Sequence, residues 1–321
     1  MYFNHQNGLF KNLSRCECMS DNPLKVHRKA TNINQVLPPV AELLTDLKHT
    51  NVSYRNLDGE EKLLDFRELT AQDSYPIPMP VDREGYGTVN SSPYFWATGH
   101  CDWLNVQTAI ERHLKPRVGQ SIRLLDFGCA SGRFLRHPAV FGGEKYDVWG
   151  CDFAVENINW NKRHFPASIK TFLNNANPHL PFPDNYFDVV AAFSVFTHID
   201  HFEDAWLLEL RRITQPGGLL YLTTQNDAMW NCYLESPYLL EHLSRANKIA
   251  SNSIHVDETL FQSPMPESRL VFRMSQSDVY NCNVWHSNDY LRAHWGRYFT
   301  IHGICDRAHN NWQSPVLLSP N

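Results

Sequence analysis

The sequence predicts an α/β fold with a mostly parallel sheet. Between residues 94 and 225, short apolar runs alternate with amphipathic stretches, which is the pattern of β-α-β units. One run, YFDVVAAFSV at residues 186–195, is almost wholly apolar, as a central parallel strand should be. Another, LLDFGCASGRFLR at 124–136, ends on an acid and continues through glycines into the first turn of a helix. With 321 residues, 42% of them hydrophobic, the chain suffices for one large domain with appended segments or for two small domains.

The expected elements follow from apolar periodicity and from proline and glycine punctuation. We expect strands at residues 122–127, 147–153, 169–173, 186–195 and 219–224. Helices are expected at about 40–47 and at 102–114. A third is expected at 202–213, where apolar residues fall on one helical face, and PGG at 216–218 should end it. A fourth should begin after Ser287, which would cap it. Two strand-like runs, FTIHGIC and SPVLL, close the chain, and the proline-rich passage YPIPMPVDREGYG is expected to be a loop.

Charge and hydropathy exclude several classes of partner. The chain has 29 Lys and Arg against 34 Asp and Glu, a net charge of -5, without a block of like charge that would follow a nucleic-acid backbone. No apolar run is long enough to span a bilayer, and the first twenty residues lack the charged start and apolar core of a signal peptide. We therefore expect a soluble, cytoplasmic protein that binds neither nucleic acid nor membrane.

The eight cysteines indicate an intracellular protein with buried thiols. Six are scattered singly, outside any disulfide or zinc spacing. Cys16 and Cys18 form a C-x-C that is either half of a metal site or part of a surface tail, and no second pair follows to complete four ligands. We predict that the protein needs no metal ion.

The acid and glycine turn indicates the class of ligand. A strand that runs into such a turn should present unpaired backbone N–H groups at its carboxyl end, which suits a nucleotide-like ligand. The spacing is Asp126-x-Gly128-x-Ala130-x-Gly132 rather than the G-x-G-x-x-G of dinucleotide sites. An acid at the strand end would repel a pyrophosphate but suits the cationic amino group of a methionine moiety. The turn therefore favours S-adenosylmethionine over NAD.

This turn resembles the first motif of the class I S-adenosylmethionine-dependent methyltransferases. Three further blocks are similar to that family in the same order: VWGCDF, NNANPHLPFPDNYFDVVAAFSVFTHI and RRITQPGGLLYLTT. The tail from residue 287 resembles the family's last helix and strand pair, so the resemblance covers about 96–318 apart from an insertion. It implies a Rossmann-like fold with a seven-stranded sheet, mostly parallel with an antiparallel last strand, and S-adenosyl-L-methionine as cofactor.

The resemblance also implies roles for single residues. Asp126 would contact the amino end of the cofactor, while Asp152 would accept hydrogen bonds from both ribose hydroxyls and Phe153 would stack on or pack under the adenine. The other expected cofactor contacts are Gly128, Ala130 (which replaces the family's middle glycine), Gly132, Asn175, Ala176 and Ser194.

The best-placed general base is His198, because it follows the fourth strand and an imidazole titrates near neutral pH. Alternatively, His198 bonds a backbone carbonyl and caps the next helix. His100 and His286 are alternatives. Arg133 would either bind the cofactor carboxylate or be a solvated helix residue. The aromatic cluster Tyr94, Phe95 and Trp96 would either cover the sulfonium or anchor the N-terminal segment.

The expected organisation is an N-terminal extension at 1–93 and a methyltransferase domain at 94–321 with a lid insertion at about 227–285. Aromatic and polar residues of the insertion suit a small acceptor such as a sugar, a secondary metabolite or a peptide-derived molecule. We expect O-methylation of a hydroxyl. N- or C-methylation, a cofactor-binding but inactive partner subunit, the identity of the acceptor and a homodimer stay open.

Overall fold

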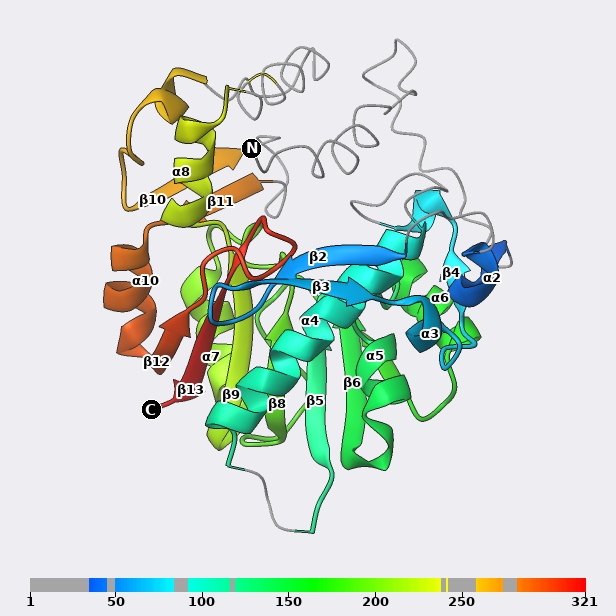
Figure 1. Cartoon of the computed structure of the whole chain (residues 1–321). Helices are drawn as coiled ribbons and strands as arrows, with labels where there is room; N and C mark the ends of the chain where they lie inside the picture. Colours follow the sequence, from blue (N-terminus) through cyan, green and yellow to red (C-terminus); the bar gives the residue numbers. More distant parts are fainter. Residues whose placement is uncertain are drawn as a thin grey trace, which may run out of the picture.

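The computed structural model describes residues 35–44, 50–83, 92–115, 119–237, 241, 258–273 and 282–321. The predicted C-x-C of Cys16 and Cys18 lies outside the described residues. Figure 1 shows a central sheet with helices on both faces and smaller elements at one end of the strands.

The central sheet has seven strands in the order β12-β13-β9-β8-β5-β6-β7. Strands β5 to β9 run parallel, and β13 is antiparallel to both of its neighbours, β9 and β12. The expected fold, a mostly parallel seven-stranded sheet with an antiparallel last strand, is confirmed. The strands are β5 (Ile122–Phe127), β6 (Tyr146–Asp152), β7 (Lys170–Leu173), β8 (Phe187–Ala192), β9 (Thr214–Thr224), β12 (Phe299–Ile304) and β13 (Ser314–Pro320).

The strand order reverses direction between β5 and β8. Strand β5 pairs with β6 on one side and with β8 on the other, and all three end at the same edge. Open α/β sheets bind ligands in the crevice outside the carboxyl ends of the strands at such a reversal. The carboxyl edge, meaning the segments that follow β5, β6, β7, β8, β9 and β12, is therefore where a functional site is expected.

Helices cover both faces of the sheet. Helices α4 (Ser92–His113), α5 (Arg136–Phe141) and α6 (Val155–His164) pack on one face, where α4 runs diagonally across the strands (Figure 1). Trp103 of α4 and Trp160 of α6 are buried in that core, and both are less than 2% exposed. Helix α7 (Glu203–Ile213) and α10 (Asn288–His294), which continues into η5 (Trp295–Arg297), contribute Trp206 and Trp295 to the core on the other face.

Several boundaries differ from the expected ones. Helix α4 begins at Ser92 rather than at residue 102, so it contains the aromatic cluster that was placed upstream of it. Strand β8 ends at Ala192, three residues before the predicted end. The glycine turn leads into turns up to Leu135, and α5 starts only at Arg136, where Pro138 fits the first turn of a helix.

The Pro-Gly-Gly segment lies inside β9 and does not end α7. Helix α7 already ends at Ile213, and the register between β8 and β9 slips over this segment, so that Phe187 pairs with Thr214 and Val189 with Leu219. Gly217 has φ +76° in this irregular segment, a left-handed conformation that glycine adopts without steric cost. The predicted cap of α10 is confirmed, because Ser287 Oγ accepts a hydrogen bond from the N–H of Tyr290 at 3.0 Å.

The N-terminal elements form a small layer against the first half of α4. They are β1 (Val36–Pro39), α2 (Val40–Leu43), β2 (Asn51–Arg55), β3 (Glu61–Asp65), α3 (Arg67–Thr70), β4 (Pro76–Pro78) and η1 (Pro80–Asp82). Part of the passage expected to be a loop is thus a short strand, β4, paired with β1. Phe95 and Trp96 pack here with Phe66 and Ile77.

A buried ion pair fixes this layer to the main domain. Arg136 of α5 and Asp73, which are both at most 1% exposed, lie 2.6 Å apart between Nε and Oδ2. Trp96 Nε1 also donates to Asp73 Oδ2 at 2.7 Å. The anchoring role considered for the aromatic cluster is therefore the one that Trp96 has here.

The inserted segment stands over the carboxyl edge in Figure 1. It contains α8 (Asp227–Glu235), η4 (Glu258–Gln262) and an antiparallel hairpin of β10 (Arg269–Arg273) and β11 (Cys282–His286). Trp230, Tyr233, Phe261 and Trp285 form its own apolar core. A bridge between Gln225 and Trp285 joins this unit, called the cap hereafter, to the end of β9.

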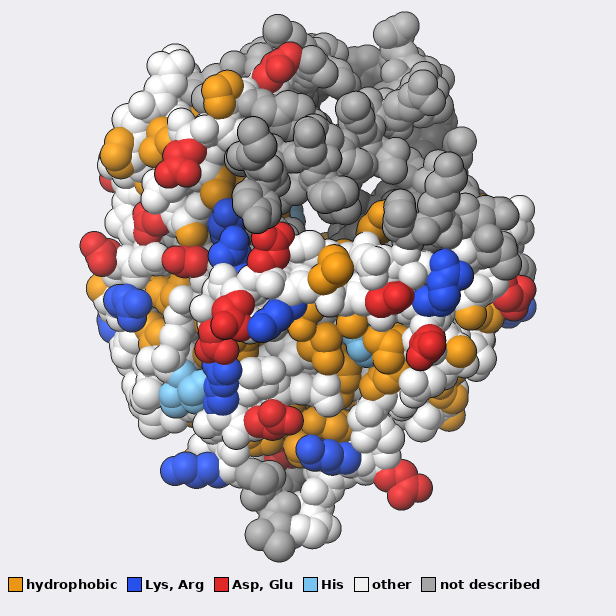
Figure 2. Space-filling model, viewed as in Figure 1, with side chains coloured by type: hydrophobic (Ala, Val, Ile, Leu, Met, Phe, Trp, Pro, Cys, Tyr) orange, Lys and Arg blue, Asp and Glu red, His pale blue; other side chains and the backbone are white. Residues whose placement is uncertain are grey.

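Charges of both signs are mixed on the surface. On the face shown in Figure 2, acidic and basic side chains lie interspersed over the described part of the surface. This described face presents no uniformly basic area of the kind that binds a nucleic-acid backbone. No described helix is long and apolar enough to cross a membrane.

The buried ion pair gives the first testable prediction. Asp73→Asn leaves the Arg136 guanidinium buried without its counter-charge, which should lower the free energy of unfolding by about 3–5 kcal/mol. Urea denaturation followed by circular dichroism measures this. The matched control is Asp58→Asn, which breaks the exposed pair with Arg112 at 2.7 Å and should leave the midpoint nearly unchanged. Equal midpoints for the two variants would contradict the prediction.

Candidate functional site

The glycine turn after β5 is held by the end of β6. The N–H groups of Gly128 and Cys129 each donate to Cys151 O at 2.9 Å, and Ala130 N–H donates to Asp152 Oδ2 at 2.9 Å. The expectation that these N–H groups are unpaired is wrong, because the neighbouring strand accepts their hydrogen bonds. The turn therefore holds its shape through the protein's own contacts.

Gly128, Ala130 and Gly132 all have left-handed backbone conformations, with φ +78°, +44° and +81°. A Cβ on Gly128 would lie 2.5 Å from Val195 Cγ2, and one on Gly132 would lie 2.4 Å from Phe165 Cε2. Both glycines are thus required by close approach as well as by φ. Ala130 adopts a conformation that costs an L-residue about 1–2 kcal/mol.

Asp126 is a buried carboxyl group at the end of β5. It is 2% exposed, and among the described residues its Oδ2 has no hydrogen-bond partner. Burial raises the pKa of Asp126 to about 8, against a smaller opposing effect of the Arg133 charge. A buried acceptor of this kind gains most from a cationic donor that enters the site.

Asp152 ends β6 and lies against the turn. Its Oδ2 accepts from Ala130 N–H and its Oδ1 from Ala154 N–H at 2.8 Å. Burial raises the pKa of Asp152, while these backbone hydrogen bonds lower it. Asn157 Nδ2 also lies 3.4 Å from Oδ1. Because each carboxylate oxygen can accept two hydrogen bonds, Oδ2 retains acceptor capacity for a ligand.

Three apolar side chains lie exposed beside Asp152. Phe153 is 66% exposed, Leu173 50% and Val155 47%. Asp152 pairs with Leu173 across β6 and β7, which places these side chains at the same corner of the carboxyl edge. Asn175 and Ala176 follow β7 and are exposed there, so the predicted adenine contacts flank the same corner.

Ser194 follows β8 and is fixed by a polar network. Its N–H donates to Thr223 Oγ1 at 2.7 Å, and its Oγ accepts from Gln313 Nε2 at 2.7 Å. Thr223 Oγ1 in turn donates to Gln313 Oε1 at 2.7 Å. Ser194 has φ +59°, so the chain turns sharply at this point, and the network keeps it there.

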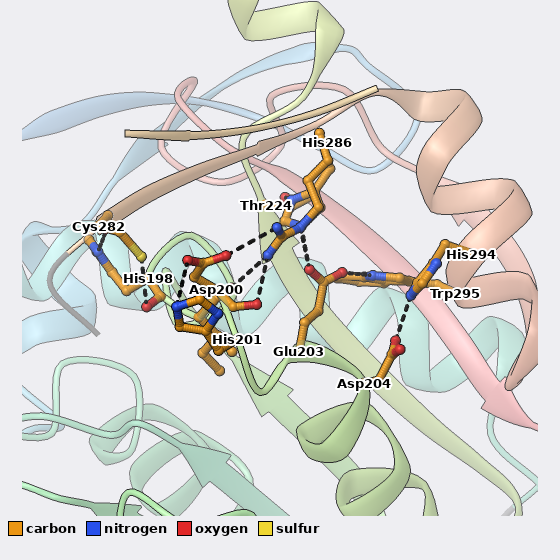
Figure 3. Close-up of polar contacts among 12 residues, drawn as sticks. His198, Asp200, His201, Glu203, Asp204, Thr224, Cys282, His286, His294 and Trp295 are labelled. Atoms are coloured by element: carbon orange, nitrogen blue, oxygen red, sulfur yellow. Dashed lines mark hydrogen bonds and ion pairs between the residues drawn. The ribbon is translucent and has the colours of Figure 1, made fainter. Parts of the chain in front are cut away.

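His198 is held by the cap. Its Nδ1 donates to Cys282 O at 2.7 Å, which leaves the lone pair of the neutral ring on Nε2. Cys282 Sγ lies 3.2 Å from His198 O, and the pair is visible in Figure 3. The predicted base thus sits where the main domain meets β11, with a fixed ring orientation.

His286 anchors the cap through a second cluster. Its Nδ1 lies 2.7 Å from Thr224 Oγ1 and its Nε2 lies 3.3 Å from Glu203 Oε2, as Figure 3 shows. Glu203 also accepts from Arg269 Nε and Trp295 Nε1, both at 2.7 Å. Burial alone would raise the pKa of Glu203, but His286 and Arg269 outweigh it and lower the pKa to about 2. Both nitrogens of His286 are engaged, so the ring serves to fix the cap in this arrangement.

His100 of α4 is buried, next to Trp96. Its ring stacks on Trp96 at 5.2 Å between centroids, and it is 4% exposed. Burial lowers the pKa of His100 to about 4, so the ring is neutral. Its neighbours are aromatic rings and His137 rather than the segments of the carboxyl edge.

The cluster of Asp102, Arg133 and His309 was not predicted from the sequence. Asp102 of α4 forms ion pairs with Arg133 at 2.6 Å and with His309 Nδ1 at 2.8 Å. Arg133 is thus not a solvated residue, because its guanidinium group is paired with Asp102 inside the protein. Residues 102 and 309 are 207 positions apart, and no local pattern in DRAHNNW marks the histidine.

Among the described residues, no group of three or more His, Cys, Asp or Glu side chains is arranged to hold a metal ion. The described cysteines are free, and Cys101, Cys129, Cys151 and Cys282 are buried. Independence of metal ions stays a prediction.

The strained turn gives a second prediction. Ala130→Gly removes the cost of a left-handed alanine and should raise the free energy of unfolding by about 1 kcal/mol. Gly132→Ala should lower it, because the added Cβ meets Phe165 and φ is +81°. Thermal unfolding of both variants beside the parent measures this, and a destabilised Ala130→Gly would refute the strain.

Comparison with known proteins identifies residues 125–222 as a match to the methyltransferase domain family. The ubiquinone/menaquinone biosynthesis C-methyltransferase of Burkholderia cenocepacia is 34% identical over 104 residues, which are 32% of this chain and 42% of the relative. The ubiquinone biosynthesis O-methyltransferase of Cereibacter sphaeroides (strain ATCC 17025) is 34% identical over 132 residues, 39% of this chain and 51% of the relative. The alignments span about half the length of these relatives or less.

Among solved structures, the PH0226 protein from Pyrococcus horikoshii OT3 aligns with a TM-score of 0.46 at 20% identity, over 74% of this chain and 99% of that chain. A S-adenosylmethionine-dependent methyltransferase from Clostridium acetobutylicum ATCC 824 aligns with a TM-score of 0.44 at 12% identity, over 71% and 92%.

The matched range begins in β5 and ends in β9, so it includes the glycine turn, Asp152 and the segment after β8. The mostly parallel seven-stranded sheet and its antiparallel β13 are those expected from the resemblance. This part of the chain therefore matches the methyltransferase domain family, in agreement with the resemblance of its motifs.

Proposed function

We propose that the protein transfers a methyl group from S-adenosylmethionine to an oxygen of a small molecule, a hydroxyl of a sugar or a secondary metabolite. The cofactor, when bound, supplies an activated methyl group on a sulfonium. The protein has to hold the cofactor, align the acceptor and remove its proton. A cytoplasmic location and a homodimer stay predictions.

The observation that carries this proposal is the buried carboxyl group of Asp126. Its Oδ2 has no hydrogen-bond partner among the described residues, and it lies at the carboxyl end of β5 beside the glycine turn. The donor set fits the cofactor, because the ammonium of a methionine moiety supplies the charge and the N–H groups that Asp126 lacks. Gly128 and Gly132 keep the turn free of side chains.

The corner beside Asp152 fits the nucleoside part of the cofactor. The remaining lone pairs of Asp152 suit the two ribose hydroxyls. Phe153 and Leu173 offer exposed apolar surface on which an adenine ring can stack, and burying that surface is favourable. We propose that Asn175 and Ala176 contact the adenine edge and that Ser194 contacts the cofactor from the end of β8.

We propose His198 as the group that accepts the proton of the acceptor hydroxyl. Its Nδ1 is committed to Cys282 O, so Nε2 is the basic atom. Removal of a proton is needed for O-methylation in particular, because a hydroxyl is a poor nucleophile until its proton is taken. Since Cys282 belongs to β11, the cap both orients this base and forms one wall of the acceptor site.

C-methylation is the second candidate. The Burkholderia relative is a C-methyltransferase and the Cereibacter relative an O-methyltransferase, so similarity of this kind supports a small-molecule acceptor and leaves the methylated atom open. Because the alignments span about half of these relatives or less, the acceptor itself has to be found by experiment.

Product analysis tests the proposal. The protein and methyl-labelled S-adenosylmethionine are incubated with a phenolic, a sugar or an amine acceptor, one acceptor in each reaction. Mass spectrometry of the product then gives the position of the transferred methyl group. We expect label on oxygen, and a rate lowered about 10²–10⁴-fold in His198→Ala. His201→Ala, which changes an exposed neighbouring imidazole, is the matched control. Label on carbon or nitrogen would contradict O-methylation. Cofactor binding without transfer to any acceptor would instead indicate an inactive partner subunit.

The raised pKa of Asp126 gives a third prediction. At pH 7, below its pKa of about 8, the carboxyl group is mostly protonated, and it should ionise when the cofactor's ammonium binds beside it. Binding should therefore release most of one proton. Calorimetric titration in two buffers of different ionisation enthalpy measures the release, which Asp126→Asn should abolish. The same heat in both buffers for the parent protein would rule out this role.

Phe153 gives a fourth prediction. Base stacking on an aromatic ring is worth about 1–3 kcal/mol, so Phe153→Ala should weaken cofactor binding roughly 5- to 150-fold. Stability should hardly change, because the side chain is 66% exposed. Leu63→Ala is the matched control, since Leu63 is 70% exposed on β3. An unchanged dissociation constant for Phe153→Ala would remove Phe153 from the site.

A further inference from the structure

The loop between β12 and β13 brings an unassigned histidine to the carboxyl edge. His309 lies in this loop, and its ring centroid is 5.4 Å from that of Phe193, the residue that follows β8. Arg133, the residue directly after Gly132, lies over the same Phe193 ring at 5.6 Å. His309 therefore lies beside segments that follow two of the central strands.

The His309 ring is held by a buried carboxylate. Nδ1 lies 2.8 Å from Asp102 Oδ1, and Asp102 is 1% exposed. Burial by itself would raise the pKa of Asp102, but the charges of His309 and Arg133 outweigh burial and lower it. Asp102 is then ionised and can only accept hydrogen bonds. Nδ1 must carry the hydrogen, and the lone pair of the neutral ring lies on Nε2.

Arg133 contacts the same carboxylate. Its NH1 group lies 2.6 Å from Asp102 Oδ2, so one carboxylate is shared by a permanent cation and an imidazole. The three groups form a chain of fixed order in which Arg133 holds Asp102 and Asp102 holds His309.

The backbone of the loop is fixed as well. His309 N–H donates to Gln313 O at 2.9 Å, and Gln313 links to Ser194 and Thr223 at the ends of β8 and β9. Arg307, Asn310 and Asn311 all have left-handed φ values between +53° and +58°. Strained backbone that persists in this way clusters at functional sites. His309 Nε2 lies 3.4 Å from the Asn310 amide nitrogen, beyond the usual range of a hydrogen bond.

We infer that His309 is an acceptor-binding residue whose Nε2 accepts a hydrogen bond from a hydroxyl or amine of the methyl acceptor, with Asp102 and Arg133 as its positioning residues. The inference rests on the proposed function and deepens it. It assigns to the acceptor a hydrogen-bond donor besides the hydroxyl that is methylated, which a sugar or a polyhydroxylated aromatic ring provides. A buried histidine that only neutralises Asp102 would explain the ion pair without any ligand.

An acceptor-binding role requires His309 to lie near the reacting sulfonium, whereas a role limited to neutralising Asp102 does not. S-adenosylmethionine carries a positive charge that S-adenosylhomocysteine lacks, and a nearby positive charge disfavours protonation of an imidazole. The experiment is an NMR pH titration of the histidine ring signals in the full chain, saturated with each of these two compounds in turn. The His309 signal is assigned with His309→Gln and, independently, through its contact with the Phe193 ring.

We expect the titration midpoint of His309 to be lower by about half a unit or more in the S-adenosylmethionine complex than in the S-adenosylhomocysteine complex. His113, the last residue of α4 and close in sequence to the amino end of β5, is the control and should have the same midpoint in both complexes. Equal midpoints for His309 in two saturated complexes would overturn the inference and leave the proposed function standing. Failure of S-adenosylmethionine to bind would overturn the proposed function, and the inference with it.

Discussion

The hydrogen bond between Asp152 and the backbone of Ala130 joins the two halves of the proposed cofactor site. One half is the glycine turn after β5, and the other is the corner formed by β6 and β7. Asp152 can make this contact because β5 and β6 are parallel and in register, with Phe127 beside Cys151. Without it, Ala130 would lose the partner that holds its left-handed conformation, and the turn would lose its position relative to Phe153 and Leu173.

Strain is concentrated at one edge of the molecule. Of the six non-glycine residues with left-handed φ among those described, five lie at the carboxyl edge: Ala130, Ser194, Arg307, Asn310 and Asn311. Each costs stability that other contacts have to offset. Here the offset is visible as hydrogen bonds that backbone N–H groups of the strained segments donate to Asp152, Thr223 and Gln313. The edge at which we propose that the cofactor binds is thus also the edge with most of the left-handed non-glycine residues among those described.

The sequence predicted the strands well because each is a short apolar run bounded by turn residues. Residues 122–127 form β5 exactly where expected, and β6, β7 and the last two strands are displaced by at most a few residues. Boundaries failed where tertiary contacts override local signals. Tyr94, Phe95 and Trp96 have no helical pattern of their own and become helical because they pack on the N-terminal layer. The Pro-Gly-Gly segment, a usual helix end, is accommodated as a bulge in β9.

The candidate site was predictable only as far as motifs are local. Asp126, Gly128, Gly132 and Asp152 stand at strand ends and could be found from spacing and family resemblance. That His286 anchors the cap through Glu203 depends on residues 83 positions apart. The Asp102 and His309 pair likewise joins opposite ends of the domain. Such contacts have no signature in a single sequence, because folding alone brings the partners together.

The most direct test of the account is a calorimetric titration of the purified protein with S-adenosylmethionine and, separately, with NAD, repeated for Asp152→Asn. The account predicts micromolar binding of S-adenosylmethionine alone, and weaker binding in the variant because the ribose acceptor and the anchor of the turn are both impaired. Binding of NAD, or no binding of S-adenosylmethionine to a folded protein, would contradict the central claim that this turn and this carboxylate form the cofactor site.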